Sequence, residues 1–211
     1  MIKLTYYGHS CFQMESGGYS IVLDPYTKVE GYKELSLEAN AVCCSHEHGD
    51  HSFRDGVKIV PAGENPFKIT EIQSFHDPEG GAKRGKNIIR IFEAEGTKLA
   101  HLGDIGCSLK PEEMEMLRGM DCILVPVGGT FTINAAEAKA LMDELNPRTV
   151  IPMHYRRNGF GYGVLQELNE FVSLYEGGSR QIGEAKGPIV INHGTNGQQD
   201  EGYYNLVVMN F

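Results

Sequence analysis

Apolar and polar residues alternate at the start of the chain, a pattern typical of short strands with one buried face. We expect strands over residues 2–7, 11–15 and 20–23. Ser16-Gly17-Gly18 is a hairpin signal between the second and third of these, so they should form an antiparallel meander. The connection over residues 28–39 is polar and is expected to contain a short helical turn at 35–38.

Further along the chain, the strands are indicated by compact apolar runs. Residues 41–44 and 122–127 are continuously apolar, as expected of strands buried on both faces. Shorter or alternating patterns predict strands over residues 57–60, 68–75, 87–93, 97–101, 149–153, 189–191 and 203–209.

Three segments have apolar residues at helical spacing. Pro111-Glu112-Glu113 supplies proline and acids to the first turn of a helix expected over residues 111–119. Asn134 should cap a helix over residues 135–145, and the apolar face of residues 164–175 predicts a third helix. Many strands are therefore accompanied by few helices.

Size and composition restrict the class of protein. A chain of 211 residues without a linker-like segment is expected to form one domain, residues 1–211. Its 41% hydrophobic and 22% charged residues are ordinary for a globular protein, and no run approaches the roughly 18 apolar residues of a membrane span. A formal charge of −9 disfavours extended binding of nucleic acid.

Two features predict a cytoplasmic location. The first seven residues are too polar and too strand-like for a signal peptide. The five cysteines are odd in number, lie mostly in apolar runs and form no CxxC pair, which fits buried reduced thiols.

One polar turn carries an unusual concentration of metal-binding side chains. Between His46 and His51, directly after the apolar run 41–44, lie three of the chain's eight histidines and Asp50. Imidazole nitrogen and carboxylate oxygen are ligands that zinc, iron and manganese accept. The competing interpretation is a polar loop that is histidine-rich by chance. The spacing favours two adjacent metal sites, with His46 and His48 facing one ion and Asp50 and His51 facing a second.

Two ions need more ligands than this turn contains. His76, Asp104 and His154 each lie at or just after the end of a predicted strand, so they could meet the histidine turn at one edge of the fold. A carboxylate at the position of Asp104 could bridge two ions about 3.5–4 Å apart.

Other histidines and cysteines near these positions have simpler interpretations. His9 is expected to support a ligand or to lie in the core, and His101 to hydrogen-bond a ligand. His193 is expected on the surface. Cys43 or Cys107 could supply a metal-site thiolate, a less favoured alternative.

Several polar residues are candidates for substrate contacts. Residues 77–87 form a glycine-rich loop with three cations, either a mobile lid that meets an anionic substrate or a plain solvated loop. The candidates are Lys83, Arg84, Lys86, Thr130, Thr132, Tyr155, Arg156 and Arg157.

The ordered set of ligands resembles the metallo-β-lactamase superfamily, whose pattern is H-x-H-x-D-H, a distant histidine, a bridging aspartate in a Gly-Asp pair, and a last histidine. The resemblance extends from Gly8-His9-Ser10 to His154-Tyr155. Flanking segments such as Ile151-Pro152-Met153-His154-Tyr155 are similar to short single-domain metal-dependent hydrolases related to ascorbate-6-phosphate lactonase.

This resemblance implies an α+β fold, a four-layer αβ/βα sandwich with the metal site at one edge of the sheets. It implies two divalent ions, zinc first, with manganese or iron as alternatives. The first ion would be held by His46, His48 and His76, the second by Asp50, His51 and His154, with Asp104 between them. Asp50 and Asp104 are the candidate catalytic residues. The residue after the Gly-Asp pair is commonly Thr or Ser in this family, whereas here it is Ile105, which removes a possible hydrogen bond to the ligands.

The ligand set predicts hydrolysis by a hydroxide held between two ions, acting on a small, anionic ester, lactone or phosphodiester. Two alternatives remain open. One is a nuclease or phosphodiesterase, and the other is a non-hydrolytic protein that uses one iron for redox chemistry or metal for structure.

Overall fold

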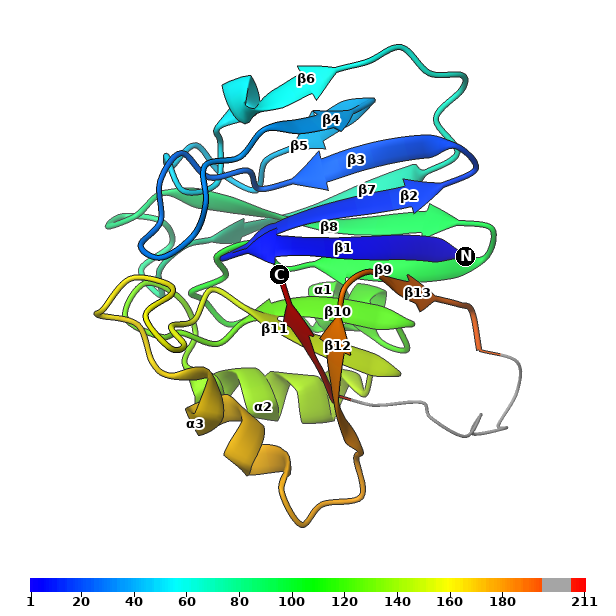
Figure 1. The fold of residues 1–211 in the computed structure, drawn as a ribbon. Helices are drawn as coiled ribbons and strands as arrows, with labels where there is room; N and C mark the ends of the chain where they lie inside the picture. Colours follow the sequence, from blue (N-terminus) through cyan, green and yellow to red (C-terminus); the bar gives the residue numbers. More distant parts are fainter. Residues whose placement is uncertain (195–205) are drawn as a thin grey trace.

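The computed structural model describes residues 1–194 and 206–211, and its strands there form two large sheets and one small one (Figure 1). The first large sheet has five strands. Their order is β13 (Ile189–Ile191), β1 (Ile2–Gly8), β2 (Cys11–Ser16), β3 (Tyr19–Leu23) and β5 (Ala41–Cys43). The expected meander is confirmed, because β1, β2 and β3 pair antiparallel through consecutive turns.

The second large sheet has seven strands and is mixed. Their order is β12 (Ile182–Lys186), β14 (Leu206–Asn210), β11 (Thr149–Met153), β10 (Cys122–Pro126), β9 (Thr97–His101), β8 (Lys86–Ala94) and β7 (Lys68–Phe75). Strands β7, β8 and β9 pair antiparallel, and the pairs from β9 to β12 are parallel. The parallel part explains why β10 and β11 are buried on both faces, which the apolar run 122–127 had predicted for β10.

The two large sheets pack face to face over an apolar core. Alternate residues of β1, namely Ile2, Leu4 and Tyr6, point into this core, while Phe92 and Leu124 come from the facing sheet. Each side chain of this size contributes about 1.5–3 kcal/mol when it is fully buried.

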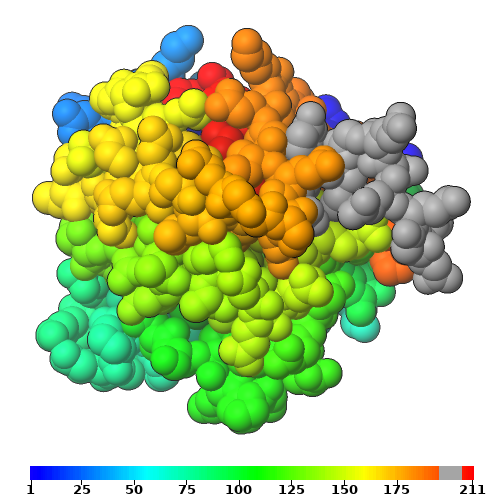
Figure 2. Space-filling view, turned by 90° about the horizontal axis from the view of Figure 1, so that it is seen from below, coloured from blue at the N-terminus to red at the C-terminus, as the bar shows by residue number. Residues whose placement is uncertain are grey.

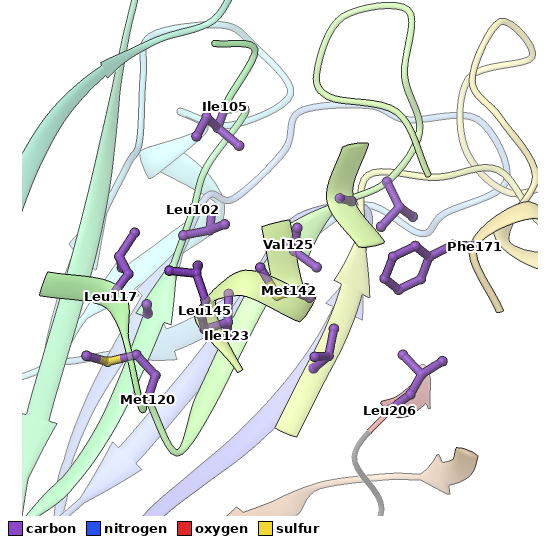
Figure 3. Close-up of a cluster of buried hydrophobic side chains, with 14 of the residues drawn as sticks. Leu102, Ile105, Leu117, Met120, Ile123, Val125, Met142, Leu145, Phe171 and Leu206 are labelled. Atoms are coloured by element: carbon purple, nitrogen blue, oxygen red, sulfur yellow. The ribbon is translucent and has the colours of Figure 1, made fainter. Parts of the chain in front are cut away.

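The helices lie against the other face of the seven-stranded sheet (Figure 1). They are α1 (Pro111–Leu117), α2 (Ala135–Leu145) and α3 (Leu168–Val172), which continues into the 3-10 turn η2 (Ser173–Tyr175). Figure 3 shows Met142 and Leu145 of α2 and Phe171 of α3 beside Ile123 and Val125 of β10.

The helix signals read from the sequence hold for α1 and α2. Helix α2 begins as expected, because the Asn134 side chain accepts a hydrogen bond from the Glu137 backbone N–H and the Glu137 carboxylate accepts one from the Asn134 backbone N–H.

The face seen from below consists mostly of residues from the second half of the sequence, with blue N-terminal residues only at its rim (Figure 2).

A fourth layer covers the outer face of the five-stranded sheet. It contains the two-stranded sheet of β4 (Leu37–Ala39) and β6 (Val57–Ile59) with the 3-10 turn η1 (Arg54–Gly56). Beneath it Tyr26 and Val29 pack with Val22 of β3. The α+β sandwich of four layers is therefore confirmed, with loops and a strand pair as the layer on this side.

Three local predictions were wrong or incomplete. Of the helical turn expected at 35–38, residues 35–36 are irregular and residues 37–38 begin β4. The helix expected to start at residue 164 begins only at Leu168, because the backbone before it bonds elsewhere: Gln166 N–H donates to the Gly128 carbonyl, and the Leu165 carbonyl accepts from Arg156. Strand β12 was missed because its sequence lacks an apolar alternation. Of the strand expected over residues 203–209, residues 203–205 lie outside the described part.

Within residues 1–194 and 206–211, no helix combines the length and apolarity needed to cross a membrane.

Candidate metal centre

The seven predicted ligands converge at one edge of the sandwich, and both large sheets contribute to them. The histidine turn follows β5 of the five-stranded sheet, where His9 also follows β1. His76 follows β7, Asp104 comes shortly after β9, and His154 follows β11 of the seven-stranded sheet. Strand ends far apart in sequence thus bring these side chains together.

Asp104 occupies the centre of the cluster. Its Oδ2 lies 3.2 Å from Nε2 of His51, 3.2 Å from Nε2 of His76 and 3.1 Å from Nε2 of His154. Nε2 of His46 is 4.0 Å from the same oxygen. This carboxylate therefore touches both sides of the cluster, as expected of a ligand shared by two ions.

The remaining ligands fall into two groups around Asp104. One, here called the His46 group, consists of His46, His48 and His76, whose ligand atoms all lie within 4.8 Å of one another. The other, here called the His51 group, consists of Asp50, His51 and His154, and His9 lies within the same 4.8 Å. The grouping agrees with the two sets of ligands that the family resemblance implies.

Several buried polar atoms of the cluster form no hydrogen bond of acceptable geometry among the described residues, although Nε2 of His51 and of His154 face Oδ2 of Asp104. They include Nε2 of His46, His51 and His154, and Oδ1 of Asp104. An unsatisfied buried polar group costs about 1–3 kcal/mol, so several at one place need an explanation. Imidazole nitrogens and carboxylate oxygens that converge in this way suit a borderline divalent cation such as zinc. The residues present therefore fit bound metal.

Asp24 orients the His51 group and was missed in the sequence. Its Oδ2 lies 2.8 Å from Nδ1 of His51, and its carboxylate also accepts hydrogen bonds from the backbone N–H and the hydroxyl of Ser45. With Nδ1 so engaged, Nε2 of His51 faces Asp104. The available signal was an aspartate at a strand end, before Pro25, which resembles an ordinary turn.

The backbone of Asp104 is fixed by a second residue that the sequence did not reveal. Asn87 accepts a hydrogen bond from the Asp104 N–H at 3.0 Å and donates to the Leu102 carbonyl. Gly103, between Leu102 and Asp104, has φ +57°, and a Cβ there would lie only 2.2 Å from the Asn87 side chain. Ile105 is fully buried in the core under the helices, so it fills apolar space and does not bond a ligand.

His9 contacts Asp50, with 3.2 Å between Nε2 and Oδ2, and its carbonyl accepts the His154 N–H. This position agrees with a residue that supports ligands. His101 lies behind the cluster: its Nδ1 accepts the Gly103 N–H, and its Nε2 lies 3.4 Å from the Ser10 carbonyl and 4.0 Å from Asp24. These contacts of His101 do not include a hydrogen bond to any of the seven predicted ligands. His193 is 65% exposed, as expected, beside Asp121.

The histidines of the cluster differ in the direction of their pKa shifts. Burial and the neighbouring His51 lower the pKa of His46 to about 3, which leaves the ring neutral and its nitrogen free to bind a cation. Burial also acts to lower the pKa of His51, but the carboxylates of Asp104 and Asp24 outweigh it and raise that pKa well above the usual value. Despite burial, His154 and His51 hold the pKa of Asp104 well below its ordinary value.

A cavity of about 300 Å³ opens onto the cluster. Three residues beyond the predicted ligands line it, namely Arg84, Phe131 and Tyr162. The Phe131 carbonyl lies 2.9 Å from Nδ1 of His76, and the ring of Tyr162 is 5.5 Å from that of His9. Burial, reinforced by Asp50 and Asp104, raises the pKa of Tyr162, so its phenol keeps its proton at neutral pH.

Most other candidate substrate contacts lie outside this cavity. Tyr155 is buried, and the hydroxyls of Thr130 and Thr132 donate to backbone carbonyls. Arg156 and Arg157 pair with Glu167 and Glu184, respectively. Neither Cys43 nor Cys107 belongs to a ligand group among the described residues, and burial raises the pKa of both thiols.

The chain matches the model of a beta-lactamase superfamily domain over residues 3–154, which includes every predicted ligand. A metal-dependent hydrolase of Thermococcus onnurineus is 29% identical, and the match covers 74% of this chain and 85% of that relative. A metal-dependent hydrolase of a Geobacillus species is 27% identical, with 86% of this chain and 96% of the relative covered.

A solved structure from Thermotoga maritima agrees over nearly the whole chain. It is described as a candidate zinc-dependent hydrolase of the metallo-β-lactamase superfamily. The TM-score is 0.73 at 31% sequence identity, and the match covers 99% of this chain and 98% of the other. The likeness therefore includes the strands that carry the cluster.

Proposed function

Because the chain belongs to the metallo-β-lactamase superfamily and is a metal-dependent hydrolase, we propose that it uses two divalent ions to hydrolyse a small, anionic ester, lactone or phosphodiester. The observation that carries this proposal is the convergence of buried, unpartnered ligand atoms around Asp104. Zinc is the proposed metal, since the ligand set suits it and the relative from Thermotoga maritima is described with it.

In this proposal the His46 group holds one ion, the His51 group holds the other, and Asp104 is shared. Two ions bound there would supply a hydroxide near neutral pH and polarise the oxygen of the substrate. No protein nucleophile is then required. The chain's own part is to fix the ligands before substrate arrives: Asp24 holds His51, His9 holds Asp50, and the Phe131 carbonyl holds His76.

The cavity limits the size of the substrate. A volume of about 300 Å³ accommodates a small molecule, and its lining combines five of the predicted ligands with Arg84, Phe131 and Tyr162. The ester, lactone or phosphodiester bond would lie over Asp50 and Asp104, the two proposed catalytic carboxylates.

The test is elemental analysis of the purified protein together with a hydrolysis screen of lactones and phosphodiesters. We expect two metal equivalents per chain and hydrolysis in at least one class. His48 is the informative ligand to replace, because it is exposed and its loss leaves the core intact. His48→Ala should lose one equivalent, and kcat should fall about 10²–10³-fold, the magnitude for losing one preorganised electrostatic element.

The matched control is His193→Ala, which removes an exposed histidine at the Asp121 contact, outside the cluster. It should keep both metal and activity. A His48→Ala protein with full metal content and full activity would remove the basis of the proposal. Preference for long nucleic acid over small diesters would instead favour a nuclease.

A further inference from the structure

We propose that Arg84 recognises the substrate through an anionic group, a carboxylate or a phosphate, that lies beside the hydrolysed bond. This inference rests on the proposed function and adds to it the feature by which one substrate is distinguished from another. Arginine suits such a role because its planar guanidinium pairs with either group through two parallel hydrogen bonds.

Arg84 is placed at one end of the metal cavity. Its side chain lines that cavity together with His48 and His76, and its guanidinium carbon lies 5.0 Å from the centre of the Phe131 ring. The same Phe131 accepts a hydrogen bond from His76 through its carbonyl. The cation is therefore held on the side of the His46 group, by stacking on an aromatic face.

Unlike Lys83, Arg156 and Arg157, Arg84 has no acidic partner among the described residues. Lys83, the preceding residue, pairs with Glu79. Arg156 and Arg157 also pair with glutamates, as described above, and the exposed Lys86 does not line the cavity. A guanidinium beside a cavity and without a carboxylate is available to an anionic ligand.

The loop that carries Arg84 is tied to a metal ligand. The carboxylate of Asp77, the residue after His76, accepts four backbone N–H groups, from Glu79, Gly81, Lys83 and Arg84, at 2.8–3.0 Å. His76 N–H in turn donates to the carbonyl of Gly85. The backbone of Arg84 is thus fixed relative to His76, which is the preorganisation that selective binding requires. Four hydrogen bonds to Asp77 hold this loop in place, which disfavours the mobile lid that was one of the two interpretations of its sequence.

Near the His51 group the cavity has different chemistry. Tyr162 lines it there together with His154, and its ring lies 5.5 Å from that of His9, which contacts Asp50. The cavity therefore offers a cation near the His46 group and a neutral phenol near the His51 group, and Asp104 contacts both groups. A substrate with one negative group would bind in a single orientation, with that group at Arg84 and its reactive bond over the cluster.

The test compares lactones with the same ring and three different substituents: a carboxylate, a phosphate monoester and a neutral amide. Wild type should prefer one or both charged compounds. Arg84→Ala should raise KM for these about 10–100-fold, which is the range of one charge-assisted contact, and leave the neutral compound unchanged. Arg84→Lys should restore part of the effect. Which of the two charged lactones responds identifies the anionic group.

The matched control is Lys83→Ala, which removes an adjacent cation that already pairs with Glu79 and should change none of these constants. Equal loss for charged and neutral lactones in Arg84→Ala would overturn the inference.

Anion binding tests the role of Arg84 independently of turnover. Isothermal titration of inorganic phosphate and of acetate into the metal-loaded protein should show at least one anion binding about tenfold more weakly to Arg84→Ala than to wild type. Equal affinities for both anions would overturn the inference, whether or not lactones are hydrolysed. Absence of hydrolysis by wild type, with phosphate or acetate binding still dependent on Arg84, would instead overturn the proposed function alone.

Discussion

The two halves of the cluster are supported in different ways. In the His51 group, His51 and His154 are completely buried, His51 contacts the carboxylate of Asp24, and Asp50 contacts His9. In the His46 group, His48 is exposed and its ring has no hydrogen bond within the described ranges.

The partners of the His46 group are also weaker. At Nδ1, the ring nitrogen that does not face Asp104, His46 and His76 have neutral partners, the Ser45 hydroxyl and the Phe131 carbonyl. A carboxylate behind a histidine fixes the ring and raises its basicity. The His51 group should therefore hold its ion more tightly than the His46 group.

The largest effect is expected at Asp104, the residue that contacts both groups. Replacing Asp104 with Ala removes the carboxylate that contacts both groups, so we expect loss of both ions and a fall in kcat/KM of about 10³-fold. Metal analysis and kinetics measure this, and thermal unfolding of the metal-free variant shows that the fold persists. If Asp104→Ala kept one tight ion, Asp104 would belong to one group only.

A smaller effect should separate the two groups. Asp24→Asn weakens the hydrogen bond to His51 and should lower the affinity of the tighter ion about 10–100-fold, while the weaker ion changes little. Titration of metal-free protein with zinc in a calorimeter resolves the two steps. His48→Ala, which removes an exposed member of the His46 group, is the comparison and should affect the weaker step. The reverse order of effects would contradict the difference between the groups.

The smallest effect concerns pH. In the metal-free protein Asp104 and Asp24 raise the pKa of His51 against the effect of burial, so the protonated ring stabilises the fold. This contribution is complete below the unfolded-state pKa of about 6.5 and is lost as pH rises through the higher folded-state pKa. Urea unfolding with a chelator present should therefore show stability falling at alkaline pH. The metal-loaded protein should lack this loss, because the ion replaces the proton on His51.

The positions of the ligands were predictable because each follows a strand whose apolar pattern is strong. His76 and His154 stand directly after such strands, and strand ends at one edge of a sandwich meet. The supporting residues were not predictable in the same way. Asp24 and His51 are far apart in sequence, and nothing local marks an aspartate before a proline as the partner of a distant imidazole.

Local sequence also could not predict which cation lines the cavity or where the third helix begins. The sequence offered five cations near the site, and only tertiary pairing with glutamates distinguishes Arg84 from Arg156 and Arg157. The start of α3 was placed too early because residues 164–167 carry a helical apolar pattern while their backbone groups bond to Gly128 and Arg156. Long-range hydrogen bonds there override local periodicity.

The ligands are drawn from both large sheets and from positions as distant as His46 and His154. A nascent chain that ends before β11 lacks His154, even when β1, β2, β3 and β5 of the five-stranded sheet have been synthesised. Metal binding by all seven proposed ligands would therefore require the two large sheets to have docked, so metal content would measure that docking.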